Sequence, residues 1–235
     1  MKALVAKALA QRVRSGETIG IGSGSTVELA VEEMGKRISE EGIVVRGVPT
    51  SHRIAAIAEK AGITVLHPGS SAEMDWAFDG ADEVDPEFRM IKGRGAAMLS
   101  EKIVAKAASK LVIIVSEDKL VDTLGSKFPV PIEVIPEALQ LVEDALKELG
   151  PREWGVRQAS SKYGPLITEH NNLVVDAWFD GIDDDLESRI KCITGVVESG
   201  LFFNCNQELL VAGEKEVKSQ LLIDGSLKEE VLSIS

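Results

Sequence analysis

The chain has 235 residues, 44% hydrophobic and 27% charged, which is typical of a globular protein and allows one large domain or two small ones. Its formal net charge of −12 disfavours nucleic acid and anionic membrane as partners, so a phosphorylated ligand would need a locally cationic pocket. No apolar run reaches the roughly 18 residues of a membrane-spanning helix, and Lys2 and Lys7 interrupt the N-terminal apolar run, which reads as a helix and not as a signal peptide.

The first half of the chain alternates short apolar segments with amphipathic ones. Apolar periodicity predicts strands at 18–21, 43–48, 63–66, 75–78 and 111–115. It predicts helices at 3–14, 26–38, 52–61 and 96–109. Strands that alternate with helices favour a parallel sheet covered on both faces, so we expect an α/β fold.

The composition changes near Phe128-Pro-Val-Pro131, where two prolines in three residues predict a domain crossing. Beyond it we expect a small α+β unit. Its predicted elements are helices at 136–149 and 183–192, a hairpin-like pair at 166–168 and 173–178, and strands at 196–203 and 209–211. We predict no helix or strand in the tail after Ser219.

Polar loops follow most of the predicted parallel strands. Four of these loops are unusual in composition, namely 22–25, 49–51, 79–85 and 116–119. Ligands bind at the carboxyl ends of the strands in an open parallel sheet. We therefore expect these loops to converge on one site at that edge.

The loop Gly22-Ser-Gly-Ser-Thr26 has the composition of an anion cradle. Glycines let the backbone approach closely, hydroxyls donate hydrogen bonds, and the following helix offers its free N–H groups to a phosphate. The alternative is a glycine turn in which Ser25 or Thr26 caps the helix. A dinucleotide site is disfavoured because the third glycine of that fingerprint is missing, and no P-loop lysine follows.

The stretch from Asp79 to Glu101 places acids, a lysine and a glycine-rich turn between a strand and a helix. Asp79 and Asp82 could hold a metal, bind sugar hydroxyls or cap a turn. Because no histidine lies nearby to complete a metal set, hydroxyl binding is favoured. Lys92 either balances these acids or stabilises a developing oxyanion.

Glu101 falls on a helix face that is otherwise small and apolar, with Ala97, Met98 and Ala105. A glutamate there is either capped by a lysine or half-buried with a raised pKa, and the latter suits a general base near neutral pH. Acids, a base candidate and a cation on one strand–loop–helix unit indicate proton-transfer chemistry.

Two further cations remain open from the residues alone. Lys119, in the last of the polar loops, is either solvated or a contact to a phosphate or hydroxyl. Arg94, between Gly93 and Gly95, binds an anion or packs at a subunit contact.

The histidines and cysteines are expected to be structural or solvent-exposed. His52, His67 and His170 are far apart in sequence. Cys192 and Cys205 lack metal-ligand spacing, and we expect two free thiols in a reducing cytosol.

Taken together, eight segments resemble the A-type family of ribose-5-phosphate isomerases. They are Gly20–Thr26, Val48–Ser51, Asp79–Pro86, Ile91–Ala97, Glu101–Ala105, Asp118–Asp122, Phe128–Val134 and Ile193–Phe202. Each is weak alone, but they occur in family order over nearly the whole chain, and that ordered set is specific. The departures are Ser23 for a frequent threonine, Arg94 for a frequent glycine, and His170-Asn-Asn172 for a common Asp-Asn-Gly turn.

The resemblance implies an α/β fold with two domains. The first is a catalytic, Rossmann-like parallel-sheet domain of residues 1–127 and 203–235. The second is a smaller α+β, ferredoxin-like domain of residues 128–202 at the subunit interface. It further implies a cytoplasmic homodimer or homotetramer that acts on a small-molecule sugar phosphate without metal or cofactor.

The resemblance also implies a reaction, the interconversion of ribose 5-phosphate and ribulose 5-phosphate through a cis-enediolate. Glu101 would move a proton between C2 and C1, and Lys92 would stabilise charge on the carbonyl oxygen. Asp79 and Asp82 would bind hydroxyls, and Asp79 would help to open the furanose ring. The residues implied to hold or line the substrate are Ser23, Gly24, Ser25, Thr26, Gly80, Ala81, Gly93, Arg94, Gly95, Lys119 and Lys2.

Two other functions fit parts of the pattern. One is a sugar-phosphate sensor of the same fold, against which the lack of a DNA-binding segment argues. The other is an acyl-transfer enzyme of the CoA-transferase type, in which Glu101 would form a thioester that hydroxylamine could trap.

Overall fold

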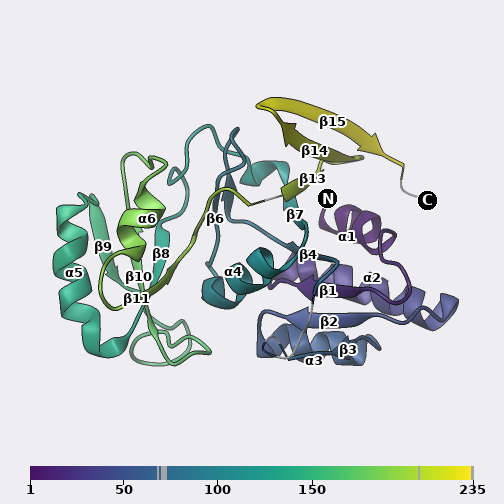
Figure 1. Cartoon of the computed structure of the whole chain (residues 1–235), viewed down its shortest axis with the longest axis horizontal. Helices are drawn as coiled ribbons and strands as arrows, with labels where there is room; N and C mark the ends of the chain where they lie inside the picture. Colours follow the sequence, from purple (N-terminus) through teal and green to yellow (C-terminus); the bar gives the residue numbers. More distant parts are fainter. Residues whose placement is uncertain (68, 70–72, 206, 234–235) are drawn as a thin grey trace. The chain divides into compact units, whose positions relative to one another are not determined.

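The computed structural model describes residues 1–67, 69, 73–205 and 207–233 (Figure 1). Contacts within the chain divide it into two units. The first comprises Met1–Ala81, Ser100–Lys119 and Cys205–Ser235, and the second comprises Asp82–Leu99 and Leu120–Asn204.

The first unit is built on one mixed sheet in the order β15-β14-β13-β7-β4-β1-β2-β3. The strands are β1 (Thr18–Ile21), β2 (Arg46–Pro49), β3 (Thr64–Val65), β4 (Trp76–Asp79), β7 (Leu111–Ser116), β13 (Gln207–Ala212), β14 (Val217–Ile223) and β15 (Ser226–Leu232). From β3 to β13 neighbouring strands are parallel, and β14 and β15 extend the sheet as an antiparallel ribbon. The expected α/β fold is confirmed.

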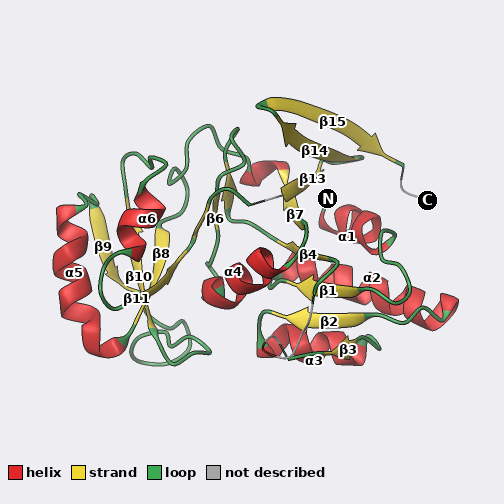
Figure 2. Cartoon of the chain, in the orientation of Figure 1, coloured by secondary structure: helices red, strands yellow, loops and turns green. Residues whose placement is uncertain are grey.

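Helices flank the parallel strands of this sheet (Figure 2). They are α1 (Lys2–Ala10), α2 (Ser25–Glu41), α3 (His52–Lys60) and α4 (Met98–Ala107), and a single 3-10 turn, η2 (Glu117–Lys119), follows β7. Helix α2 buries the predicted apolar face, including Val27, Val31 and Met34, in one core with Ile19 and Ile21 of β1. This burial explains why an amphipathic period identified the helix.

The second unit holds two antiparallel sheets. A sheet in the order β11-β8-β10-β9 is formed by β8 (Val130–Val134), β9 (Glu153–Val156), β10 (Leu173–Trp178) and β11 (Val196–Ser199). Its helices are α5 (Leu139–Glu148), after the 3-10 turn η3 (Pro136–Ala138), and α6 (Leu186–Lys191). A small sheet in the order β12-β6-β5 is formed by β5 (Glu83–Val84), β6 (Met90–Ile91) and β12 (Leu201–Phe202).

Several element predictions in the second half of the chain were wrong. Residues 166–168 form no strand, because Ile167 makes only an isolated bridge to Leu173 and β10 pairs with β8 and β9 instead. Strand β8, whose five residues are all buried, lies in the proline-rich segment, where no strand was predicted. The predicted strand at 196–203 breaks at Gly200 into β11 and β12, which belong to different sheets.

The tail after Ser219, left unassigned from sequence, continues β14 and forms β15, and residues 234–235 lie outside the described residues. Strand β2 begins only at Arg46, later than predicted. Strands β5, β6 and β9 were not predicted at all. Each has no more than four residues, too few for an alternating pattern to stand out.

The contact division differs from the predicted domain boundaries in residues 82–99, 120–127 and 203–204, which belong to the second unit. A buried carboxylate explains much of this difference. Glu83 accepts backbone N–H groups from Gly125 (2.6 Å), Lys127 (2.5 Å) and Phe128 (2.8 Å). Strand β6, which follows Glu83, also pairs with β12.

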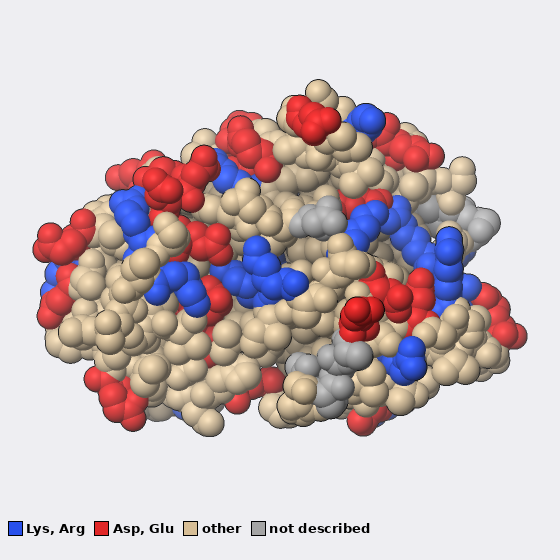
Figure 3. Space-filling model, in the orientation of Figure 1, with Lys and Arg blue, Asp and Glu red and all other residues tan. Residues whose placement is uncertain are grey.

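Acidic side chains are spread over the face of the molecule drawn in Figure 3, in keeping with the net charge of −12. Within the described residues no helix combines the length and the apolar composition that crossing a bilayer requires.

Candidate functional site

Four of the polar loops singled out from sequence leave the same edge of the first unit's sheet. Strands β7, β4, β1 and β2 are adjacent and parallel, so their carboxyl ends point the same way. The expected convergence of these loops follows from that order. It brings Gly22, Pro49, Asp79 and Ser116 to one edge.

Asp79, the last residue of β4, is 3% exposed and tightly placed. Its Oδ1 accepts the backbone N–H of Ser23 at 3.1 Å and that of Gly80 at 2.7 Å. A Cβ atom on Gly22 would lie 2.1 Å from the Asp79 carboxyl carbon. Only glycine therefore fits at the end of β1 beside this carboxylate.

Hydroxyl groups and one lysine gather at the loop before α2. The Ser23 hydroxyl lies 2.9 Å from the Thr50 hydroxyl and donates to that of Ser51 at 2.8 Å. Gly24, with φ +128°, leads into α2, whose first residue Ser25 accepts a hydrogen bond from Lys2 Nζ at 2.9 Å. A helix N-terminus, hydroxyls and an ammonium group are the elements of an anion site.

The remaining members of this loop set are less enclosed. Thr26, Gly80 and Ala81 are half-buried. Lys119, the last residue of η2, is also half-buried. The structure brings Lys2 to the loop as the resemblance implied. Lys119 lies at the carboxyl end of β7, the neighbour of β4.

Glu101 lies in the first turn of α4 and is 5% exposed. Helix α4 connects back to β7, so its N-terminal turn begins at the carboxyl edge of the parallel strands. One turn later Val104 packs on β1 so closely that a Cβ on Gly20 would lie 2.3 Å from its Cγ1. This contact seats the helix on the sheet and buries the face that carries Glu101.

In the second unit, the hairpin of β5 and β6 pairs Glu83 with Ile91. Asp82 and Lys92 are the next residues outward on the two strands, with the Asp82 amide donating to the Ile91 carbonyl at 2.9 Å. The hairpin thus brings together two residues that sequence reasoning singled out separately.

Lys92 is 3% exposed, an unusual degree of burial for a lysine. Its backbone amide donates to the carbonyl of Gly200 at 2.8 Å. Its ammonium nitrogen lies 5.3 Å from the centroid of the Phe202 ring, within cation–π range. A Cβ on Gly200 would lie 2.1 Å from the Lys92 carbonyl oxygen, so Gly200 permits this backbone approach.

The glycine-rich turn after Lys92 has a distinctive backbone. Gly93 has φ +99° and Ala96 has φ +60°, a left-handed conformation that residues other than glycine rarely adopt. The Arg94 amide donates to Asp82 Oδ2 at 3.0 Å, and the exposed Arg94 guanidinium lies 5.2 Å from the Phe128 ring. Gly95 is exposed.

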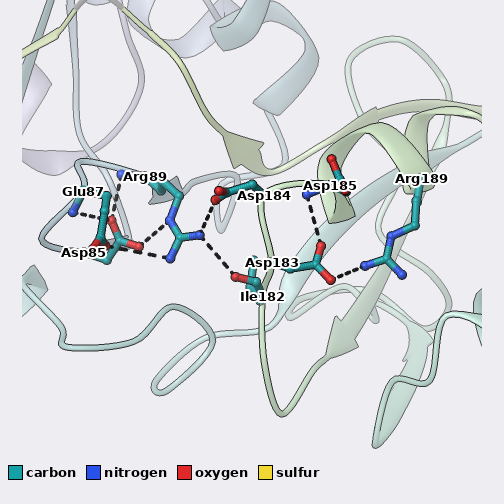
Figure 4. A network of polar contacts seen from close by, with 8 residues as sticks. All are labelled: Asp85, Glu87, Arg89, Ile182, Asp183, Asp184, Asp185 and Arg189. Carbon is teal, nitrogen blue, oxygen red and sulfur yellow. Dashed lines mark hydrogen bonds and ion pairs between the residues drawn. The ribbon is translucent and has the colours of Figure 1, made fainter.

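A polar network anchors the hairpin that carries Asp82 and Lys92 (Figure 4). Arg89 donates to Asp85 at 2.7 Å and to Asp184 at 2.7 Å. Burial of the Asp85 carboxyl raises its pKa, and the bonds from Arg89 oppose that effect. Asp183, next to this network, pairs with Arg189 at 2.6 Å.

The three histidines are exposed. Among the described residues, no group of three or more His, Cys, Asp and Glu side chains is arranged to hold a metal ion. Cys192 is exposed and Cys205 half-buried, and both are free thiols.

Sequence reasoning missed four residues that support the candidate site. The Glu83 carboxylate, the Arg157 guanidinium and Gly200 bind backbone groups, Arg157 through the carbonyls of Gly93 and Arg94. Phe202 instead places its ring near the Lys92 ammonium group. Gly200 and Phe202 fall in a segment that carried the family resemblance, but no feature of their own marked them. Arg157 lies outside those segments, and no sequence signal pointed to it.

The sequence is similar to a known family model and to curated proteins. The family model described as ribose 5-phosphate isomerase A (phosphoriboisomerase A) matches residues 46–216. Ribose-5-phosphate isomerase A of Methanothermobacter thermautotrophicus is 42% identical over 92% of this chain and 95% of the relative. That of Thermosynechococcus vestitus is 45% identical over 90% of each chain.

Solved structures agree with these sequence matches. Ribose 5-phosphate isomerase A from Methanocaldococcus jannaschii superposes with a TM-score of 0.88 at 42% identity, covering 93% of this chain and 96% of that one. A D-ribose-5-phosphate isomerase in complex with phospho-erythronic acid superposes with a TM-score of 0.89 at 37% identity, with the same coverage of 93% and 96%. The chain therefore belongs to the ribose 5-phosphate isomerase A family of enzymes.

Proposed function

We propose that this protein interconverts D-ribose 5-phosphate and D-ribulose 5-phosphate by proton transfer. The observation that carries the proposal is the burial of two ionisable groups, Glu101 and Lys92, in a chain of this family. Burying a glutamate or a lysine costs free energy unless the charge is paired or hydrogen-bonded, so both residue types are seldom fully buried. Aldose–ketose isomerisation needs such a pair, one base and one cation.

Glu101 is the proposed base. Its carboxylate takes the proton from C2 of the open-chain aldose, and the C–H electrons form the C1=C2 double bond of a cis-enediolate. The charge that develops on the C1 oxygen is stabilised by the ammonium group of Lys92. Return of the carbon-bound proton to C1, with transfer of the hydroxyl proton from O2 to O1, completes the ketose.

Asp79 and Asp82 are the proposed hydroxyl-binding groups. Two backbone N–H groups at Asp79 Oδ1 and one at Asp82 Oδ2 leave each carboxylate further acceptor capacity for a sugar hydroxyl. Asp79 also takes part in opening the furanose ring: it accepts the proton of the C1 hydroxyl as the C1–O4 bond breaks, and it returns that proton to O4. The proposed substrate site is lined by Gly80, Ala81, Gly93, Arg94 and Gly95.

The phosphate is held by the loop Ser23-Gly-Ser-Thr26 together with Lys119 and Lys2. The hydroxyl cluster, the start of α2 and the Lys2–Ser25 bond support this assignment. A relative solved in complex with phospho-erythronic acid, a phosphorylated sugar acid, supports a sugar phosphate as the ligand. The planar carboxylate of that acid presents two oxygens much as an enediolate does.

The family resemblance also leads us to propose a location, a pathway and an oligomeric state. We place the reaction in the cytoplasm, in the non-oxidative branch of the pentose phosphate pathway, and expect a homodimer or homotetramer that needs no cofactor. Two free thiols fit a reducing compartment. Residues 128–202 are the proposed small domain at the subunit interface.

The deciding experiment is an isomerase assay of the wild type and Glu101→Gln. The amide keeps the size of the side chain but cannot take the proton, so we expect kcat at least about 10²-fold lower while ribose 5-phosphate still binds. Glu59→Gln, an exposed change on α3, is the matched control. Near wild-type turnover by Glu101→Gln would reject Glu101 as the base, and an inactive wild type would reject the function.

A further inference from the structure

One peptide group of the glycine-rich turn is held from both sides. The group joins Gly93 to Arg94, and its N–H donates to Asp82 Oδ2 at 3.0 Å. Its carbonyl oxygen, that of Gly93, accepts Arg157 Nη1 at 2.9 Å. The same nitrogen donates to the next carbonyl, that of Arg94, at 3.0 Å. The Ala96 amide also donates to the Gly93 carbonyl at 2.9 Å, within the turn itself. Arg157 and Asp82 are the side chains that hold this peptide plane from outside the turn.

Arg157 is itself rigidly placed. It follows β9, and its amide donates to the Val174 carbonyl at 2.8 Å. Its Nε and Nη2 bind the two carboxylate oxygens of Asp176 on β10 at 2.7 and 2.5 Å, with the Arg157 side chain only 14% exposed. A forked guanidinium can donate hydrogen bonds to a carboxylate and to two carbonyls at once, and a lysine cannot.

This arrangement sits directly after Lys92 and against Asp82, two residues to which the proposed function gives roles. We propose that Arg157, oriented by Asp176, is a positioning residue of the isomerase. It fixes the Gly93–Arg94 peptide, and through that peptide it fixes the carboxylate of Asp82. The inference rests on the proposed function for its effect on turnover, but the held peptide is a property of the fold.

The backbone conformation of the turn explains why this peptide needs support from Arg157. Gly93 adopts φ +99° without strain, but Ala96 is held at φ +60°, which a residue with a side chain rarely adopts. Without Arg157 the Arg94 carbonyl loses this donor, while the Gly93 carbonyl keeps its bond from the Ala96 amide at 2.9 Å. The peptide is then held less firmly and can rotate toward other partners. Asp82 then loses its bond to the Arg94 amide, and the hydroxyl-binding carboxylate becomes mobile.

The test compares Arg157→Gln, Arg157→Lys and Asp176→Asn with the wild type. We expect Arg157→Gln to lower kcat about 10- to 100-fold with a smaller change in KM, as loss of a supporting contact typically does. The other two variants should fall between it and the wild type, because each keeps part of the contact. Arg152→Gln is the matched control: its partner is Asp180, at 3.2 Å on the surface of the same unit, and its kcat should be unchanged.

A double-mutant cycle separates positioning from general loss of stability. If Arg157 acts through Asp82, adding Arg157→Gln to Asp82→Ala should reduce kcat by less than about twofold more, whereas independent effects would multiply. Multiplying effects, or a wild-type kcat in Arg157→Gln, would overturn the inference.

Hydrogen exchange tests the same contact without any assay. In Arg157→Gln the Arg94 amide should exchange at least about 10-fold faster than in the wild type, with the strand amides of β10 unchanged. If the wild type has no isomerase activity, the proposed function fails, and this measurement alone judges the inference. Unchanged exchange at Arg94 would then reject it.

Discussion

Asp79 owes its place to the absence of a side chain at Gly22. The two residues end neighbouring parallel strands, and the Asp79 carboxyl group fills the space that a Cβ at position 22 would occupy. Backbone amides of Ser23 and Gly80 then hold one of its oxygens. The position of this carboxylate is thus encoded partly in a residue that has no chemistry of its own.

Replacing Gly22 tests this dependence. In Gly22→Ala the new methyl group displaces the Asp79 carboxylate and weakens its two amide bonds, so we expect kcat/KM for ribose 5-phosphate to fall about 10²-fold, the cost of misplacing a reacting group. Gly181→Ala is the matched control, because a Cβ there meets no atom within 4 Å. Urea unfolding of both variants separates misplacement from unfolding. A wild-type kcat/KM in folded Gly22→Ala would contradict the proposed role of Asp79.

Candidate site residues could be predicted from the sequence where the side chain itself has the proposed chemical role. Asp79, Asp82, Lys92 and Glu101 were chosen as acids, a cation and a base in one stretch. Arg157 could not be chosen, since its contacts are backbone carbonyls more than 60 positions away in sequence. Such contacts leave no pattern along the chain.

At the scale of elements, β13 carries a buried acid outside the candidate site. Glu208 is 3% exposed and receives Arg12 at 2.8 Å, Lys110 at 2.6 Å and the Ser219 hydroxyl at 2.5 Å. Burial alone would raise its pKa, but these bonds outweigh burial and lower the pKa from 4.5 to about 2. The acid joins β13 to the turn that follows α1, to the residue that precedes β7, and to β14, all within one unit.

This network predicts acid-dependent stability. A carboxylate whose pKa is lower in the folded chain stabilises it fully above the unfolded pKa of about 4.5, and that stabilisation is lost as the pH falls toward 2. By urea unfolding we expect Glu208→Gln to be less stable than the wild type by about 3 kcal/mol at pH 7, with the difference shrinking between pH 4.5 and 2.

The control for this measurement is Glu230→Gln, an exposed change on β15. It should track the wild type across the same pH range. A difference between wild type and Glu208→Gln that stays constant from pH 7 to pH 2.5 would show that the carboxylate is not ionised in the way its contacts require.

Elements were predictable in proportion to their length and regularity. The helix α2 and the strand β7 were found because many residues repeat one pattern. The strand β8 was missed because Pro131 reads as a strand breaker, yet the carbonyl of Pro131 still accepts the Gly200 amide at 2.7 Å. Pairing with residues far along the chain, and not local preference, makes this segment a strand.

For the molecule as a whole, the proposed proton transfer predicts independence from divalent metal. A hydride-shift isomerase would need a cluster of histidines and carboxylates, and the described part of the chain offers no group of three or more suitable side chains. We expect kcat/KM to be the same in excess EDTA as in buffer with added magnesium. Loss of turnover in EDTA that a divalent ion restores would contradict proton transfer by Glu101.

Taken by itself, the sequence determined the class of fold, the family and the chemical identity of the main candidate residues. These follow from local features: apolar periodicity, loop composition and motifs in a set order. Only the tertiary structure decided which strands pair, how the chain divides into units, and that Glu83, Arg157 and Gly200 support the candidate residues. Those facts depend on contacts between distant segments, in which a side chain meets a backbone group, and a backbone group looks the same at every position of a sequence.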